Sequence, residues 1–194
     1  GLAISVFGAF AVVGPAHRRF GKRDTAIFAV LLSGAFSFLP YAARNLGWWP
    51  ELGSWTSMTL LLAFMTVSLL GLISATISSS SMVAEIVEAH EVEHGTRIEG
   101  VFFAGYLMVQ KFGQALGIFL VGQLVAYVGL GEQVRPEDWP ASAATTMGWI
   151  FAVLMVLIAA AAATGLRRYA IDRASHEARL EALASVTDRE PPVP

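Results

Sequence analysis

The sequence predicts an all-α integral membrane protein. Hydrophobic residues make up 55% of the 194 residues, whereas charged residues make up only 14%. A soluble domain carries about 25% charged residues, and a small domain buries only about 70% of its surface on folding. So much apolar surface is therefore accommodated more easily in lipid than in water. The absence of cysteine excludes disulfide bonds and thiol chemistry.

The apolar residues form four long runs and one shorter run. The long runs cover residues 25–43, 55–84, 100–130 and 141–166, and each approaches or exceeds the roughly 20 residues that cross a bilayer as a helix. Residues 1–14 are apolar but too short to cross, so we expect them to be the end of a fifth helix. None of the runs alternates as the strands of a membrane β-barrel do. We therefore expect a partial transmembrane domain over residues 1–166.

The positions of Lys and Arg predict the orientation in the membrane. If residues 15–24 face the cytoplasm, alternation of the spans places Arg97 and the C-terminal tail on the same side. Apart from Arg44 and Arg135 on the opposite side and Lys111 within a span, every Lys and Arg then lies inside. The positive-inside rule thus predicts a multi-pass protein of the inner cell membrane with a cytoplasmic C-terminus. Four tryptophans fall near the outer ends of the spans, where indole rings prefer the interface: Trp48, Trp49, Trp55 and Trp139.

Residues 167–194 are predicted to form a cytoplasmic tail. Apolar side chains are scattered among charges up to residue 185, as in an amphipathic helix on a membrane surface. The last residues, 187–194, are charged and rich in proline, which predicts disorder. We assign the tail no binding role.

A basic segment joins the first two apolar runs. Residues 14–23 read Gly-Pro-Ala-His-Arg-Arg-Phe-Gly-Lys-Arg, and we expect a tight turn between two helices because glycine permits the bend. The cations, Arg18 and Arg19 among them, would hold this turn on the inner side. A topology signal without further function is the alternative interpretation.

Three carboxylates follow the long run that starts at residue 55. Glu85, Glu88 and Glu91 recur every three positions, so on a helix they lie along one side. Like charges stacked in this way repel, and acids near a helix C-terminus oppose the helix dipole. A partner surface with basic groups would offset that cost. The alternative is a solvated helix end.

One lysine lies deep within a predicted span. Lys111 is about 16 Å along a helix that starts at residue 100, where an ammonium costs about 3 kcal/mol unless it reaches water or a counter-ion. Tyr106, Gln110 and Gln114 form one stripe of this helix, with Lys111 beyond its edge. We expect these four side chains to face a polar cavity. Snorkelling of Lys111 to the inner interface is the alternative.

Residues 85–117 resemble the glycoside–pentoside–hexuronide cation symporter family, the melibiose type, of the major facilitator superfamily. Residues 14–23 resemble the weaker second-half copy of the superfamily pattern G-x-x-x-D-R-x-G-R-R, with Arg18 in place of the aspartate. The resemblance implies the C-terminal half of a twelve-helix fold, here from the end of the eighth helix onward. The residues that match in order and spacing are Glu85, Glu88, Glu91, Arg97, Glu99 and Lys111.

This resemblance also implies a function. The whole protein would be a secondary transporter that couples a sugar or glycoside to Na⁺ or H⁺, with Lys111 linking the sugar and cation sites. Glu85, Glu88 and Arg97 would belong to a cytoplasmic gate, to which we add Glu91, Arg18 and Arg19. Glutamate at 85 and 88 departs from the commoner aspartate.

The expected partners follow from the same resemblance. They are the lipid bilayer, a small solute, for which we expect a sugar, and the N-terminal half of the transporter, with no nucleic acid. Because the family's principal cation ligands lie in that N-terminal half, we expect no cofactor here beyond the coupling ion.

A rival interpretation comes from His90-Glu91-Val92-Glu93-His94, which matches the H-E-x-x-H zinc motif of metalloproteases. Gly95 is expected to end the helix at this point, and no downstream His or Asp offers an obvious third ligand. We therefore expect no metal and no enzymatic activity. A carrier of another solute in the same superfamily, such as a drug, lipid or organic acid, and a non-transporting scaffold are the remaining alternatives.

Overall fold

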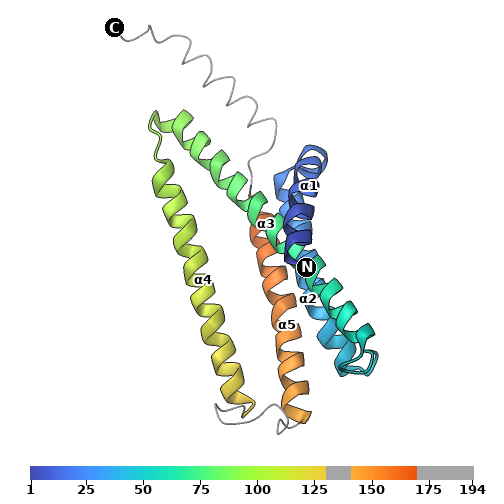
Figure 1. The fold of residues 1–194 in the computed structure, drawn as a ribbon. Coiled ribbons are helices and arrows are strands. Elements are labelled where there is room, and N and C mark those ends of the chain that lie inside the picture. Colours follow the sequence, from blue (N-terminus) through green and yellow to red (C-terminus); the bar gives the residue numbers. More distant parts are fainter. Residues whose placement is uncertain (130–140, 170–194) are drawn as a thin grey trace, which may run out of the picture.

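The computed structural model describes residues 1–129 and 141–169. Within these ranges the chain is helical without a strand, which confirms the predicted all-α class (Figure 1). Four helices are long and apolar enough to cross a membrane, again as predicted. The helices are α1 (Leu2–Phe20), α2 (Lys22–Asn45), α3 (Trp55–His94), α4 (Glu99–Tyr127) and α5 (Ala141–Leu166).

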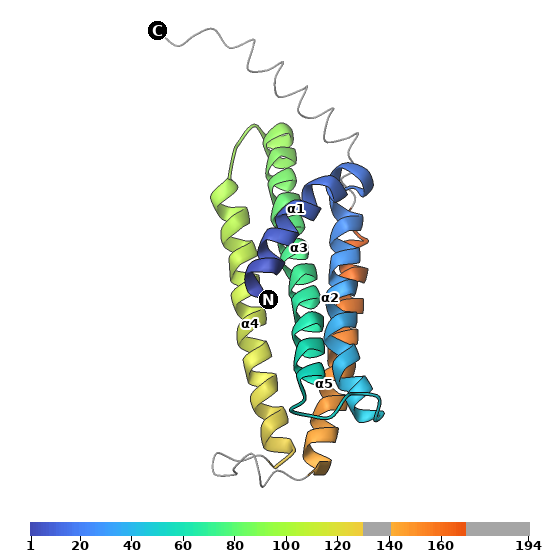
Figure 2. The same cartoon turned by 45° about the vertical axis from the view of Figure 1, so that its right-hand side comes forward.

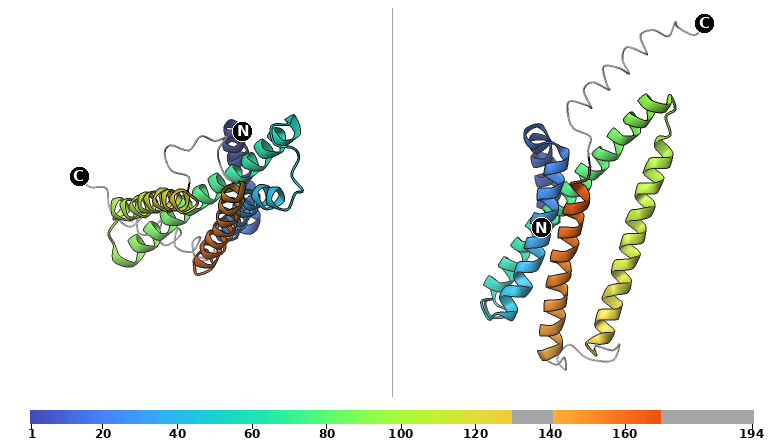
Figure 3. Two further views of the ribbon diagram at one scale, coloured as in Figure 1. Left: turned by 90° about the horizontal axis from the view of Figure 1, so that it is seen from below. Right: turned by 180° about the vertical axis from the view of Figure 1, so that it is seen from behind.

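Helix α2 lies at the centre of the packed part of the molecule. It packs along α3 on one side and along α5 on another. Helix α1 crosses α3 and also touches α2 (Figure 2). Helix α4 stands apart: its principal neighbour is α3, the views in Figure 3 separate it from α2, and none of its residues is buried. Its faces are therefore left for lipid or for other parts of the protein.

Small and hydroxylated side chains form the contacts among α2, α3 and α5. Gly34 of α2 lies against Ala159 of α5, and Gly71 of α3 lies against the backbone of α2 near Ala29. The Ser37 and Ser68 hydroxyls are 2.7 Å apart across the α2–α3 contact. Close backbone approach and interhelical hydrogen bonds are how helices associate where no hydrophobic effect drives them together.

Helix α3 is longer than a bilayer requires. Its 40 residues extend over about 60 Å, whereas the hydrocarbon core is about 30 Å thick. Ser54 caps its start by accepting a hydrogen bond from the Ser57 N–H at 3.1 Å. Gly95 ends it in the left-handed conformation with φ 67°, as predicted. The apolar run up to residue 84 thus continues as a polar helical extension.

The predicted tight turn between the first two helices is present, but it is shorter than residues 15–24. Helix α1 continues through Pro15 to Phe20, Gly21 alone turns the chain with φ 81°, and α2 begins at Lys22. A proline inside a helix removes one hydrogen bond and need not end the helix. The basic side chains of the last turn of α1 also stabilise it, because they complement the negative end of the helix dipole.

Some predictions concern residues outside the described ranges. The amphipathic and disordered tail is described only at Arg167, Arg168 and Tyr169, which form a turn after α5. Trp139 and Arg135 of the predicted outer side also lie outside. At that predicted side Trp48 and Trp55 are exposed, as residues at a membrane interface would be.

We predict that Gly71→Ala weakens the packed unit. An added Cβ would lie 2.7 Å from the Ala29 carbonyl oxygen, a backbone atom that cannot rotate away, so we expect a loss of about 1–3 kcal/mol from overpacking. Gly8→Ala is the matched control, because its Cβ would meet only the flexible end of Leu70 at 3.0 Å. Thermal unfolding of the full-length protein in detergent measures both. Equal midpoints for the two variants would contradict this prediction.

Candidate functional site

A buried carboxylate of α3 contacts the start of α2 and the segment that follows α5, at one end of the molecule. Glu85 on α3 is only 7% exposed. One of its oxygens lies 2.6 Å from the ammonium of Lys22, the first residue of α2. Its other oxygen accepts a hydrogen bond of 2.5 Å from the Tyr169 hydroxyl, just after α5. Both oxygens are therefore used within this part of the chain, and we call this cluster the Glu85 junction.

A second polar contact lies beside the Glu85 junction. His17 on the last turn of α1 is 2.8 Å from the hydroxyl of Ser78 on α3. Ser78 is fully buried and donates its own proton to the Ser74 carbonyl at 2.8 Å. Its oxygen is thus left to accept from Nε2–H of His17. Burial lowers the pKa of His17, and the positive charge of Lys22 lowers it further, against an opposing effect of Glu85.

Arg97 connects the end of α3 to the start of α4. Its guanidinium is 3.1 Å from the Glu99 carboxylate and 3.5 Å from that of Glu91. The hydrogen bond to Glu99 and the negative charge of Glu91 raise the pKa of Arg97, with a smaller contribution from Glu88. The pairs are largely exposed, so solvent screens them. We call residues 88–99 the acidic hairpin; its tip is at the top of Figure 1.

The two arginines predicted for the gate lie elsewhere. Arg18 and Arg19 are exposed on the last turn of α1, and neither forms an ion pair with a residue of the described ranges. The guanidinium carbon of Arg19 is 5.3 Å from the ring centre of Phe20. The structure does not bring these arginines to the acidic hairpin, and their role in a gate stays a prediction.

The predicted polar stripe of α4 divides into two parts. Tyr106 is half-buried and accepts a hydrogen bond from the Ser80 hydroxyl of α3 at 3.3 Å, and Gln110 is also half-buried. Lys111 and Gln114 are exposed, and the ammonium donates to the Gln114 side-chain oxygen at 3.4 Å. The stripe thus begins against α3 and continues onto the open side of α4. Whether this side lines a cavity stays a prediction.

The two histidines of the H-E-x-x-H motif stack on each other. Their ring centres are 4.3 Å apart with 17° between the planes, and His90 also packs edge-on against Phe102. Among residues 1–129 and 141–169, no group of three or more His, Cys, Asp or Glu side chains is placed to hold a metal ion. The expectation of no metal site stays a prediction.

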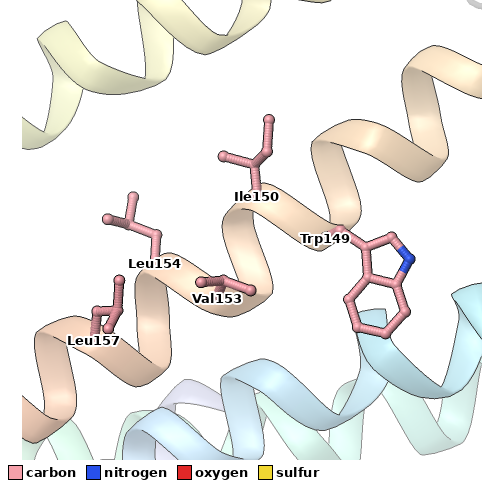
Figure 4. Close-up of a pocket in the computed structure, with 5 residues that line it drawn as sticks. All are labelled: Trp149, Ile150, Val153, Leu154 and Leu157. Atoms are coloured by element: carbon pink, nitrogen blue, oxygen red, sulfur yellow. The ribbon is translucent and has the colours of Figure 1, made fainter.

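A groove of about 380 Å³ runs along one face of α5. Figure 4 shows its lining, which consists of Trp149, Ile150, Val153, Leu154 and Leu157. A ligand site for a polar solute needs a few well-placed polar groups, and this lining is almost wholly apolar. The groove therefore fits an apolar neighbour, such as an acyl chain or a helix, better than a sugar.

Sequence reasoning missed two members of the Glu85 junction. In the sequence Lys22 is one of several basic residues on the predicted inner side, and Tyr169 is one of several apolar side chains scattered through the tail. Neither lies within 60 positions of Glu85 in the chain, so no local spacing connects them. The antiparallel packing of α2 on α3 and of α5 on α2 is what brings them together.

We predict an energetic coupling between Glu85 and Lys22. Replacing Glu85 by Gln leaves a partly buried ammonium without its counter-charge, so a double-mutant cycle of Glu85→Gln with Lys22→Met should give about 1–3 kcal/mol. The exposed pair Arg23 and Asp24, 3.0 Å apart, is the control and should give about 0–1 kcal/mol. The measurement is the unfolding free energy in mixed micelles. Similar coupling energies in both cycles would contradict the prediction that the Glu85–Lys22 pair contributes more than an exposed pair.

We also predict that His17 makes stability depend on pH. Its folded-state pKa lies below the unfolded value of 6.5, so between these two values the unfolded chain binds more protons and stability rises with pH. This contribution is complete above pH 6.5 and is lost as the pH falls through the folded-state pKa. His17→Gln keeps an N–H donor for Ser78 but cannot titrate, so its stability should vary less over this range. His94→Gln, at the exposed end of α3, is the control and should follow the wild type in thermal midpoints measured against pH.

Comparisons with known proteins agree with the helical architecture and with the symporter resemblance. Residues 1–173 match the family described as MFS/sugar transport protein. A stretch of 103 residues is 30% identical to the protein named "Putative glycoside/cation symporter YagG" of Escherichia coli K12, covering 53% of this chain and 21% of that protein. A stretch of 60 residues is 38% identical to an uncharacterized symporter of Synechocystis, covering 31% of this chain and 11% of the relative.

The matched regions therefore span about a fifth and about a tenth of these two curated relatives. No solved structure matches the chain significantly. The family match, in contrast, extends through all five helices. This chain is a multi-pass membrane protein that belongs to the MFS/sugar transport protein family.

Proposed function

We propose that the whole protein is a secondary active transporter that couples the uptake of a sugar or glycoside to Na⁺ or H⁺ by alternating access. The family match over residues 1–173 and the symporter names of two relatives support this proposal. In such transporters the two halves rock around a central site near the middle of the membrane. The present chain would supply one wall of that site and part of the inner gate, and would carry no catalytic residue.

The position of Lys111 within a candidate span is the main structural support for the proposal. It lies about 18 Å along α4 from Glu99, on a helix of the length and composition of a membrane span. Its only polar contact within the described ranges is the long one to Gln114. An ammonium at this depth needs water or a counter-ion. A carboxylate of the N-terminal half, close to the coupling ion, would satisfy that need.

The acidic hairpin is the proposed inner gate. Helix α3 is long enough for its last turns to project beyond the hydrocarbon, so Glu88 and Glu91 would lie in the cytoplasm. There they would contact basic groups of the other half when the inner side closes. Arg97 lies at the same tip, bonded to Glu91 and Glu99, and could exchange these partners during the cycle. Glu85 contributes differently, because Lys22 and Tyr169 already occupy both its oxygens.

The basic ends of α1, α2 and α5 indicate the proposed orientation. Arginine and lysine side chains gather where α1 ends, where α2 starts and just after α5. By the positive-inside rule this side faces the cytoplasm, which places the C-terminus there as well. The membrane would be the inner cell membrane.

We predict that Lys111→Val abolishes uphill transport without preventing insertion. Removing the charge relieves a desolvation cost, but it also removes the link between solute and ion. Lys111→Arg should fail too, because a planar guanidinium does not replace a compact ammonium. Gln123→Val is the control, since Gln123 lies on the same helix about 100° or more from each residue of the stripe.

The measurement uses the full-length protein in proteoliposomes with an imposed Na⁺ or H⁺ gradient. Accumulation of radiolabelled mono- and disaccharides is normalised to the amount of inserted protein. Coupled accumulation by Lys111→Val at the level of the Gln123→Val control would show that the lysine only snorkels. If the wild type accumulates none of these sugars under either gradient, the result would contradict sugar symport itself.

A further inference from the structure

Three helix ends meet at one corner of the molecule, and all three are basic. The Glu85 junction holds the start of α2 and the residue that follows α5 on the same carboxylate, at 2.6 and 2.5 Å. A single residue, Gly21, separates the end of α1 from the start of α2. We call this corner the basic end, formed by Arg18, Arg19, Lys22, Arg23, Arg167 and Arg168.

Only some of these cations are neutralised. Lys22 is paired with Glu85, and Arg23 is paired with the neighbouring Asp24. Four arginines remain, all of them exposed and without an ion pair among the described residues: Arg18, Arg19, Arg167 and Arg168. Four guanidinium groups at one corner repel each other, so the corner favours an anion of some kind.

The position of the basic end relative to the membrane indicates the class of anion. Lys22 begins one candidate span and Leu166 ends another, so the four arginines lie where the apolar core gives way to lipid headgroups. Phe20 is 60% exposed at the same level and lies beside Arg19. An exposed aromatic ring next to cations is typical of the membrane interface. A dissolved anion would leave this ring in water, whereas a phospholipid would cover it.

We propose that the basic end binds the headgroups of anionic phospholipids, with Arg18 and Arg19 on one side and Arg167 and Arg168 on the other. Guanidinium groups can hold phosphate oxygens through two parallel hydrogen bonds, and basic clusters beside membrane spans attract anionic lipid. The Glu85 junction fixes the spacing of the two arginine pairs.

The test titrates the purified full-length protein in detergent micelles with dioleoyl phosphatidylglycerol and counts bound lipids by native mass spectrometry. We expect tighter binding of phosphatidylglycerol than of phosphatidylcholine. The variants Arg18→Gln/Arg19→Gln and Arg167→Gln/Arg168→Gln each remove two charges. We expect phosphatidylglycerol binding to weaken about fivefold for each charge removed. Arg18→Lys/Arg19→Lys should keep most of the binding, because the charges remain.

Arg44→Gln is the matched control. Arg44 is an exposed arginine in the last turn of α2, at the opposite end from Lys22, so its loss should leave the binding unchanged. Wild-type affinity in the variant lacking all four arginines would overturn the proposal and indicate that carboxylates elsewhere in the protein pair with them. Displacement of the lipid by an equal concentration of inorganic phosphate would also overturn it, in favour of a site for dissolved anions.

Discussion

The carboxylate of Glu85 organises one end of this molecule. A buried charge is costly unless it is paired and its remaining lone pairs are used. Here one oxygen contacts the ammonium of Lys22 and the other accepts from the hydroxyl of Tyr169, so the requirement is met by two segments distant in sequence. Losing either partner would leave a buried charge incompletely paired. The two contacts therefore hold α2, α3 and the segment after α5 together. The contact of His17 with Ser78 adds α1 to the same group.

Below that end, the packing of small residues continues the same unit. Gly34 against Ala159 and Gly71 against Ala29 bring α5 and α3 close to α2, and serine hydroxyls bridge the α2–α3 contact. Helix α4 takes little part in this packing. It is joined to α3 through Ser80 and Tyr106 and through the ion pairs of Arg97. In the proposed transporter, a helix with so few contacts and with an ammonium at mid-length would take its surroundings from lipid and from the other half.

The sequence predicted those features that depend on local composition. The four spans follow from hydrophobic length, and the end of α3 follows from Gly95, whose conformation few other residues adopt. The turn between the first two helices was predicted, but its length was overestimated because polar residues, proline and glycine were all assigned to it. In the structure Gly21 alone turns the chain, and the arginines before it stabilise the C-terminus of α1. Lys22 and Tyr169 could not be predicted as partners of Glu85, since their proximity depends on which helices pack together.

The acidic hairpin and the Glu85 junction differ in exposure and packing, and this difference suits them to different roles. The acidic hairpin lies where α3 is followed by α4, the least packed of the described helices. Its ion pairs are largely exposed, so exchanging partners there costs little. The Glu85 junction is buried and lies in the most tightly packed unit, so its contacts resist exchange. A transporter half that rocks as a body needs both properties: a corner that keeps its shape against the membrane surface, and a separate polar tip whose pairs can open and close. In the proposed transporter the gate would therefore lie in the hairpin, and the junction would belong to the scaffold that carries it.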